Sequence, residues 1–371
     1  MEMKSLIIIC LVIVCVAAQA TNNSNLISVV VIARHGDRTP TKFAPLDPYS
    51  DHKYWPAGRG ELTNVGIQQH YNLGRWLRER YADFIPSKYN KKDIYVRSAS
   101  ADRCLMSAAS NLAGLYPPTE DQIWNPNLPW RPIPIHSKPK SEDYIFEMGS
   151  ICPRYEEIYQ DLLNSVEFKE IDALNSALYA YLETNLGVKI ESFTDIQPWY
   201  DTLRIEELNN LTLPNWTHSV YPDVMKQWSD QTFKVSTYDS ELARFGTGPF
   251  FDKISKHFEA ASTNLTKKLI AKKIVLFTGH QTNICDISNA LKVFREAPFA
   301  SALIFELRND TKSSKPFVQL LYKTEEGLEV LKMKKCSVEC DLEDFLRIVE
   351  PLRMNDTQVI EECNITKTFL E

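Results

Sequence analysis

Several basic side chains stand at or just after apolar runs of this chain, where they could bind and attack a phosphate group. They are Arg34, His35, Arg38, Arg97, Arg103 and His280. Guanidinium groups offer forked donors that match phosphate oxygens, and a neutral imidazole can attack phosphorus as a nucleophile. In the segment Arg-His-Gly-Asp-Arg-Thr-Pro, Gly36 would let the backbone turn between the histidine and the next arginine. The residue types predict a phosphate-handling site.

Apolar runs rich in β-branched residues predict the strands that position these side chains. Such runs occupy 27–33, 94–96 and 274–278, and helix-like stretches follow at 62–81, 102–115 and 283–294. Further strands are expected at 302–307, 317–322 and 328–333, as an antiparallel edge. We therefore predict an α/β fold, a three-layer sandwich with a mostly parallel central sheet flanked by helices. Ligands of such sheets lie outside the carboxyl ends of the strands, so the strand-end residues should converge.

The rest of the chain organises into one large domain. Residues 1–20 have the pattern of a secretion signal, with a basic residue, an apolar run and small residues at its end. The domain is expected to span 21–371, with a helical insertion at about 140–260 where helical periodicity occurs without strand runs. The Pro-rich segment 116–139 should be an extended surface connection.

Cysteines and glycosylation sequons point to an extracellular protein. Removal of the signal takes two of the eight cysteines and leaves an even number, as expected for disulfides in an oxidising compartment. Sequons stand at Asn22, Asn210, Asn215, Asn264, Asn309, Asn355 and Asn364. No later stretch reaches the roughly 20 apolar residues that span a bilayer, so no membrane partner is expected. A net charge of −6 with dispersed basic residues argues against nucleic acid.

Each basic residue taken alone has an ordinary interpretation. A single Arg is usually a solvated surface charge, and a single His is more often a hydrogen-bonded structural residue. The functional interpretation rests on the pattern R-H-G-x-R-x-P directly behind a buried strand, with a second strand ending in Gly-His. The histidines show no HExxH spacing and the cysteines no paired CxxC, so neither a metal nor another cofactor is predicted.

Together these segments resemble the histidine acid phosphatases, branch 2 of the histidine phosphatase superfamily. The resemblance covers nearly the whole mature chain and includes RHGDRTP, LTNVGIQQHYNLGRWLRERY, VRSASADRCLMSAASNLAGLYPP, NNLTLPNW and KKCSVECDLEDF. It implies that His35 is the phosphate-accepting nucleophile and His280 the second histidine of the pocket. The implied phosphate ligands are Arg34, Arg38 and Arg103. Arg97 would be a neighbour without an assigned role.

Gln281 departs from the family pattern. The family normally has an aspartate after the second histidine, and that aspartate protonates the leaving alcohol. A glutamine amide can hydrogen-bond the leaving oxygen but has no proton to give. Loss of a positioned general acid typically costs on the order of 10²–10⁴ in rate.

Disulfide pairing is also implied by the resemblance. It pairs Cys152 with Cys363 and Cys336 with Cys340. The two remaining cysteines, Cys104 and Cys285, each lie near a strand end, so they are expected to bridge beside the pocket. The family's other disulfide has no cysteines available near Glu207 or Ala300.

The sequence is compatible with three functions. The first is an active secreted phosphomonoesterase, which needs another acid in place of the missing carboxyl. The second, narrowly favoured, is a weak or inactive phosphatase that binds a small molecule in the old substrate cleft. The chain also resembles acid phosphatase-like salivary proteins of blood-feeding insects, some of which bind biogenic amines or leukotrienes. A structural or adhesive role ranks last because it leaves the retained basic residues unexplained. Related acid phosphatases often dimerise, so a homodimer is compatible with this assignment.

Overall fold

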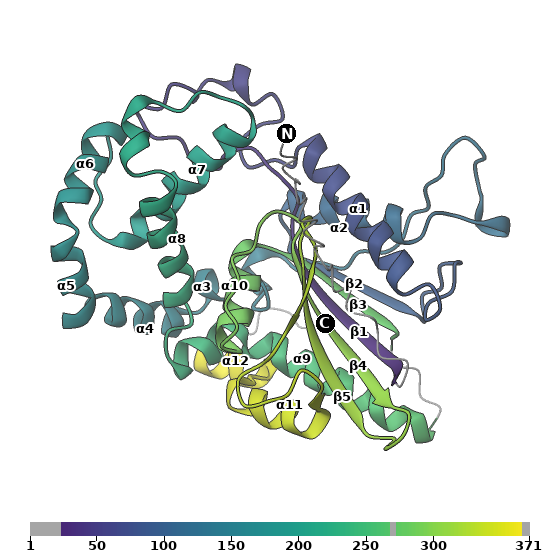
Figure 1. Cartoon of the computed structure of the whole chain (residues 1–371). Helices are drawn as coiled ribbons and strands as arrows, with labels where there is room; N and C mark the ends of the chain where they lie inside the picture. The colour runs from purple at the N-terminus through teal and green to yellow at the C-terminus, as the bar shows by residue number, and fades with distance from the viewer. Residues whose placement is uncertain (1–23, 268–271, 366–371) are drawn as a thin grey trace, which may run out of the picture.

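A twisted central sheet with helices on both faces forms the body of the protein, and a group of helices extends from one side of it (Figure 1). The computed structural model describes residues 24–267 and 272–365. The predicted signal 1–20 and the sequon at Asn22 lie outside the described residues. The sheet order is β2-β3-β1-β4-β5-β6, with β7 also paired to β5. The strands are β1 (Ser24–Arg34), β2 (Ile94–Ser98), β3 (Ile274–Gly279), β4 (Ala302–Asp310), β5 (Pro316–Lys323), β6 (Leu328–Leu331) and β7 (Cys340–Asp341).

Helices fill most of the sequence between the strands. In chain order they are α1 (Asn64–Arg80), α2 (Asp102–Leu115), α3 (Met148–Ile151), α4 (Pro153–Leu163), α5 (Val166–Leu174), α6 (Ser176–Leu186), α7 (Gln197–Leu208), α8 (Asp223–Val235), α9 (Ser240–Lys267), α10 (Gln281–Ala290), α11 (Leu342–Val349) and α12 (Asp356–Glu362). The segment 116–139 is largely without regular structure, as expected of an extended connection.

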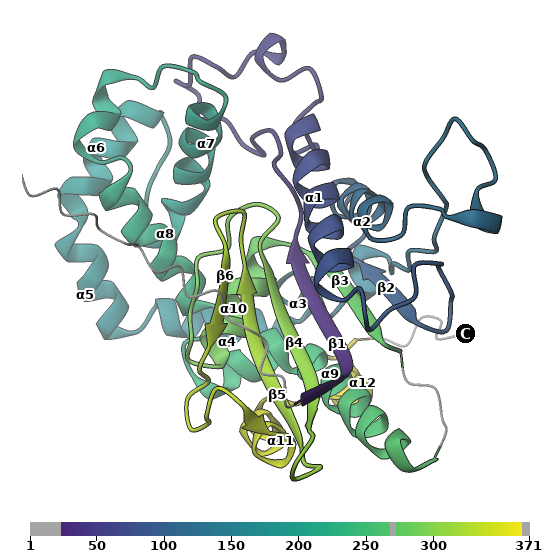
Figure 2. The same ribbon diagram turned by 45° about the vertical axis from the view of Figure 1, so that its right-hand side comes forward.

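Both faces of the sheet are covered, which explains the unbroken apolar sequence of β1. Val29 and Val31 point to the face packed by α1 and α2, where they join one apolar core. Val30 and Ile32 point to the opposite face and join a second core with α9 and α10. Because side chains alternate along a strand, a strand buried on both faces must be apolar at every position. Figure 2 shows α1 and α2 side by side next to β1, with α9 running below the sheet.

The α/β class and the layered architecture are confirmed, but the sheet is mixed rather than mostly parallel. Parallel pairing joins β2 to β3 and β3 to β1. From β4 to β6, every pairing is antiparallel. Antiparallel pairing was expected only at the edge of the sheet, yet it begins next to the central strand β1, which pairs antiparallel with β4. The connections from β4 to β5 and from β5 to β6 are short, which requires antiparallel pairing there, since a parallel crossover needs a dozen or more residues.

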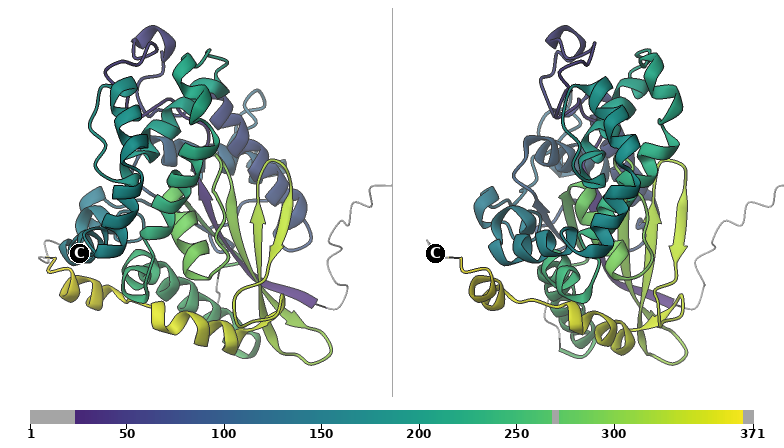
Figure 3. Two further views of the ribbon diagram at one scale, coloured as in Figure 1. Left: turned by 60° about the vertical axis from the view of Figure 1, so that its left-hand side comes forward. Right: turned by 90° about the vertical axis from the view of Figure 1, so that its left-hand side faces the viewer.

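Helices α4–α8 form a helical lobe with its own core. Phe168, Leu182, Leu203 and Met225 are buried there, away from the sheet. By contrast α9 packs directly under the sheet, so we propose to end the insertion before α9 rather than near residue 260. The yellow C-terminal helices run along the base of the molecule beside α9 in both views of Figure 3.

The lobe contains a buried carboxyl that should make the fold sensitive to alkaline pH. Glu206 on α7 is buried beside Asp47, and burial together with that neighbour raises its pKa to about 9. The folded protein therefore holds this proton at a pH where the unfolded chain has released it, so stability falls as pH rises toward 9. Burial lowers the pKa of His70 to about 4. Such a buried histidine makes the protein more stable as pH rises, but only below about pH 6.5, where the unfolded histidine is protonated.

We expect Glu206→Gln to flatten the loss of stability between pH 6.5 and 8.5. The native protein should lose about 2–3 kcal/mol more of its free energy of unfolding over this window than the variant does. Thermal melts at each pH measure the difference, with the exposed Glu170→Gln as the matched control. An identical pH dependence in native protein and Glu206→Gln would contradict the prediction.

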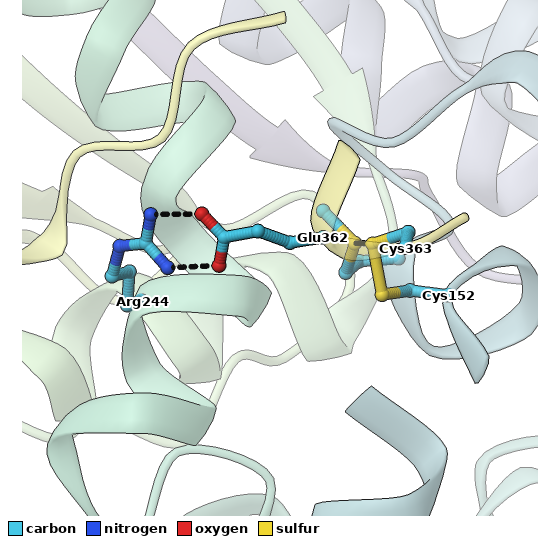
Figure 4. The surroundings of a disulfide bond; sticks show 5 residues. Cys152, Arg244, Glu362 and Cys363 are labelled. Atoms are coloured by element: carbon cyan, nitrogen blue, oxygen red, sulfur yellow. Dashed lines mark hydrogen bonds and ion pairs between the residues drawn. A yellow bond between two sulfur atoms is a disulfide. The ribbon is translucent and has the colours of Figure 1, made fainter. Parts of the chain in front are cut away.

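The C-terminal segment is fastened to α9 and to the start of the lobe (Figure 4). Both terminal nitrogens of Arg244 donate to the carboxylate of Glu362, at 2.6 Å each. The next residue, Cys363, forms a disulfide with Cys152 directly before α4. Cys336 and Cys340 form a second disulfide. Both pairings implied by the family resemblance are therefore present.

The two disulfides should differ in their contribution to stability. The Cys152–Cys363 bridge spans 211 residues and the Cys336–Cys340 bridge spans 4. Because a longer closed loop restricts the unfolded chain more, Cys152→Ser with Cys363→Ser should lower the free energy of unfolding by about 5 kcal/mol. The matched pair Cys336→Ser with Cys340→Ser should lower it by about 2 kcal/mol. Chemical unfolding of both double variants measures this order, and a reversed order would contradict it.

Candidate active site

Two neighbouring strand ends bring the two histidines together. Arg34, the last residue of β1, pairs in register with Gly279, the last residue of β3. The backbone N–H of His35 then donates to the carbonyl of Gly279 at 2.9 Å. His280 follows that glycine, and the rings of His35 and His280 lie 5.7 Å apart between centroids. Parallel pairing of two separate sequence segments thus forms the centre of the site.

The loop after β1 passes very close to α1. A Cβ atom on Gly36 would lie 2.3 Å from the carbonyl oxygen of Gly66, so only glycine fits. The requirement is close approach of two backbones rather than the tight turn suggested by the sequence. Asp37 accepts a hydrogen bond from Thr63 Oγ1 at 2.5 Å, and Thr63 is the N-cap of α1. The Asp37 carboxylate is therefore held at the start of α1.

The surroundings of His35 favour a neutral imidazole with a defined tautomer. Its Nδ1 lies 2.8 Å from the carbonyl oxygen of Gly36. A carbonyl oxygen only accepts, so Nδ1 carries the proton and Nε2 keeps its lone pair. Burial and then the nearby charges of Arg34 and Arg38 hold the pKa of His35 well below its usual value. Both effects favour the neutral imidazole, which is the form that can act as a nucleophile.

Two of the arginines are fixed by groups distant in sequence. Arg34 donates to the carbonyl of Ala297 at 2.6 Å and lies 4.1 Å from the ring centroid of Phe299. Arg38 donates to the carboxylate of Asp201 at 3.0 Å. Asp201 also lies 4.0 Å from Arg34, so one carboxylate on α7 orients both guanidinium groups. The helical lobe thus contributes directly to the site.

Arg103 completes a ring of donors around the histidines. Its Nη2 atom lies 3.5 Å from Nδ1 of His280. The Nε atoms of Arg34, Arg38 and Arg103 are all buried, and none has a hydrogen-bond partner in the described part of the chain. Burial and the neighbouring Arg38 lower the pKa of Arg34 to about 9. Three guanidinium groups that share one carboxylate and keep unpartnered Nε donors are suited to bind an oxyanion.

His280 is held by its own helix and by a carboxylate. As the N-cap of α10, it donates its backbone N–H to Asn283 Oδ1 at 2.8 Å. Its Nε2 lies 3.2 Å from Oε1 of Glu147. Burial opposes a charge on Glu147, but the contact with His280 and the charge of Lys140, 3.7 Å away, together lower its pKa. Glu147 is therefore an ionised partner of the second histidine.

Gln281 occupies the first position of α10, directly after His280. It is half-buried there, and its amide has no proton to give. Glu147 is the carboxylate in contact with His280, and it comes from a different segment. The predicted replacement of an acid by an amide is thus located at Gln281, directly beside His280.

Arg97 does not join the other basic residues. It lies inside β2, with Phe277 as its register partner, and its guanidinium donates to the buried carboxylate of Asp143 at 2.6 Å. The Arg97 guanidinium also lies 5.5 Å from the centroid of the Phe146 ring. The expectation that Arg97 follows the strand and faces the phosphate pocket is wrong, because β2 continues to Ser98 and the strand alternation turns Arg97 to the α9 face.

The predicted Cys104–Cys285 disulfide is also wrong, since both cysteines are free and buried. The Cys104 sulfur lies 3.5 Å from the carbonyl of Gly279 and 3.7 Å from Nδ1 of His280. The Cys285 sulfur instead lies 3.7 Å from the carbonyl of Arg295. The sulfurs point to different partners although their helices begin near one another, and a disulfide needs Cβ vectors that face each other.

Three residues of the site had no signal in the sequence: Glu147, Asp201 and Phe299. Each reaches the pocket from a loop or helix far along the chain, without a motif around it. Among the described residues, no group of three His, Cys, Asp or Glu side chains is placed to hold a metal ion. The absence of a metal from the working protein stays a prediction.

Comparison with known proteins places this geometry in a family. The model of the histidine phosphatase superfamily (branch 2) matches residues 25–323. Lysosomal acid phosphatase of Xenopus laevis is 35% identical over 350 residues, covering 92% of this chain and 79% of that protein. Prostatic acid phosphatase of Homo sapiens is 34% identical over 352 residues, covering 92% and 88%.

Solved structures agree at the level of fold. Hafnia alvei phytase in complex with tartrate matches with a TM-score of 0.68 at 19% identity, covering 90% of this chain and 98% of that chain. The Citrobacter braakii phytase matches with a TM-score of 0.64 at 18% identity, covering 92% and 100%. None of the described helices is long and apolar enough to cross a membrane. By its family match and its extended identity to acid phosphatases, the chain belongs to branch 2 of the histidine phosphatase superfamily.

Proposed function

We propose that this is a secreted acid phosphatase-like protein that binds phosphate monoesters at His35 but hydrolyses them weakly. The observation that carries the proposal is a buried set of arginines with unpaired Nε groups around a neutral His35, next to an amide at Gln281. Binding of the phosphate needs only the arginines and the neutral His35. Efficient turnover of an alkyl ester also needs a proton donor.

The proposed reaction has two steps. In the first, Nε2 of His35 attacks phosphorus, a nitrogen–phosphorus bond forms, and the ester oxygen leaves with the electrons of its bond to phosphorus. Arg34, Arg38 and Arg103 balance the charge on the phosphoryl oxygens. In the second, water attacks phosphorus, the bond to His35 breaks, and inorganic phosphate is released. The leaving oxygen of the first step must take its proton from solvent, since Gln281 has none to give.

A retained pocket with reduced chemistry is also suited to hold a small molecule. Of the two ligand classes suggested by the resemblance to salivary proteins, a leukotriene fits better than a biogenic amine. Its carboxylate would meet three guanidinium groups, whereas an ammonium group would be repelled by them. We therefore propose an anionic ligand as the natural occupant. A homodimer stays a prediction that light scattering can check.

Comparison of two leaving groups tests the proposed function. Aryl phosphates expel a stabilised anion and depend little on a general acid, whereas alkyl phosphates depend on it heavily. The secreted, disulfide-intact protein should hydrolyse p-nitrophenyl phosphate slowly between pH 4 and 8 and glycerol phosphate hardly at all. Comparable rates on both esters would reject the proposal and establish a fully active enzyme.

The alternative is an active secreted acid phosphatase in which Glu147, ionised in the free protein, takes up a proton when the anionic substrate binds and passes it to the leaving oxygen. Its support is the 3.2 Å contact between Glu147 and His280, which places a carboxyl at the pocket. If this alternative holds, Glu147→Gln will lower glycerol phosphate hydrolysis about 10²-fold and leave p-nitrophenyl phosphate hydrolysis within a few fold.

Under the favoured proposal, we expect Glu147→Gln to change both rates by the same small factor. Glu147 then only orients His280, and orientation affects every ester alike. Steady-state kinetics on the two esters measure the ratio. A selective loss on glycerol phosphate would move the assignment to the alternative.

A further inference from the structure

A second cavity, separate from the phosphate site, lies between the sheet and α9. It has a volume of 430 Å³, and no phosphate-site residue lines it. Val30, Val275 and Phe277 form its wall on the sheet, and Ile254 forms its wall on α9. Ile145, half-buried in the loop before α3, forms part of its rim. The volume falls within the range of small-molecule sites, which are concave and mostly apolar.

Most of the charge at this cavity is internally paired. Arg97 is bound to Asp143 at 2.6 Å, and Lys253 to Asp356 at 2.8 Å. His257 is hydrogen-bonded to Ser28 at 2.7 Å, and burial lowers its pKa, so it adds no charge at neutral pH. These groups contribute polarity to the cavity without a net charge.

Two lysines at the cavity are not paired in this way. The Lys138 ammonium lies 4.9 Å from the ring centroid of Tyr144, and Lys272 donates to the backbone carbonyl of Lys91. In the described ranges, neither lysine makes an ion-pair contact with a carboxylate. The remaining acidic group of the lining, Glu142, is exposed to solvent. An apolar chamber with two such ammonium groups attracts a molecule that is apolar along its body and acidic at one end.

We propose that this cavity binds an anionic amphiphile, with the apolar body against the sheet and α9 and its carboxylate or sulfonate beside Lys138 and Lys272. The site shares no lining residue with the pocket of His35. Binding there is therefore independent of phosphatase activity, and it does not rest on the function proposed above.

Fluorescence titration with 1-anilinonaphthalene-8-sulfonate, followed by displacement with decanoate, tests the site in the full-length secreted protein. We expect decanoate to displace the probe at lower concentration than decanol or decyltrimethylammonium. Inorganic phosphate, which belongs at the arginines, should not displace the probe. Displacement by phosphate, or equal displacement by the cationic and anionic amphiphiles, would overturn the proposal.

Two variants locate the binding event. Ile145→Trp should fill the rim and weaken probe binding at least about tenfold. Lys138→Glu should weaken decanoate about tenfold while leaving decanol unchanged, because only the charged group interacts with Lys138. Lys169→Glu, an exposed lysine on α5, is the matched control and should behave as the native protein. Melting temperatures within a few degrees of the native value verify folding. Should Ile145→Trp misfold, an unchanged decanoate affinity in Lys138→Glu overturns the proposal on its own.

Discussion

Gln281→Asp is expected to raise the hydrolysis of glycerol phosphate by about 10²–10⁴-fold, because it restores a proton donor where the leaving oxygen departs. The site around it is otherwise complete: His35 has a free Nε2, and three arginines surround the place of the phosphate. Gln281 opens α10, where a negative charge is favoured by the helix dipole, so the aspartate should not disturb the fold. The gain on p-nitrophenyl phosphate should be much smaller.

Gln281→Asn is the matched control for this change, since it has the size of aspartate and no acidic proton. Its rates should stay at the native level on both esters. A gain in Gln281→Asn equal to that in Gln281→Asp would mean that side-chain length, rather than acidity, limits the native protein. A native protein that already matches Gln281→Asp would show that another group supplies the proton.

His35→Ala is expected to remove hydrolysis of p-nitrophenyl phosphate altogether, a loss of at least about 10⁴-fold. The reason is that aryl esters tolerate the missing acid but still require the nucleophile. Ala297, Phe299 and Asp201 hold Arg34 and Arg38, and Arg103 lies beside His280, so inorganic phosphate should still bind without His35. Acid-labile labelling of the native protein by substrate, absent from His35→Ala, would identify the phosphohistidine.

His52→Ala controls for the loss of an imidazole, because His52 lies on the surface in a short helical turn outside the site. It should retain the native rate. Residual hydrolysis in His35→Ala close to the native rate would show that the measured activity does not pass through His35. Loss of phosphate binding in the same variant would show that the imidazole, and not only the arginines, holds the anion.

The dependence of Arg34 and Arg38 on Asp201 links the helical lobe to the chemistry. Asp201 lies on α7, and the buried Tyr200 and Leu203 of the same helix belong to the core of the lobe. Its carboxylate is the acceptor that orients Arg38 and approaches Arg34. Correct placement of these two proposed phosphate ligands therefore requires that the lobe be folded and docked against the loop after β1.

Local sequence was sufficient for the elements and for the centre of the site. Apolar β-branched runs predict buried strands, and parallel strands have their carboxyl ends at the same edge of the sheet. That placed Arg34, His35 and Arg38 at the end of β1 and His280 at the end of β3, and the structure brings them together. The predicted departure at Gln281 likewise rests on the sequence alone, because the identity of a side chain does not depend on its surroundings.

Only the tertiary structure decided which other groups complete the site. The side chain of Arg97 faces α9 because β2 extends through it, and a shift of one residue in a strand changes the face. Cys104 and Cys285 remain thiols because their sulfurs point to different carbonyls. Glu147 and Asp201 reach the pocket from segments more than a hundred residues away from their partners. Contacts of that kind depend on how the lobe and the loops pack, and no local pattern records them.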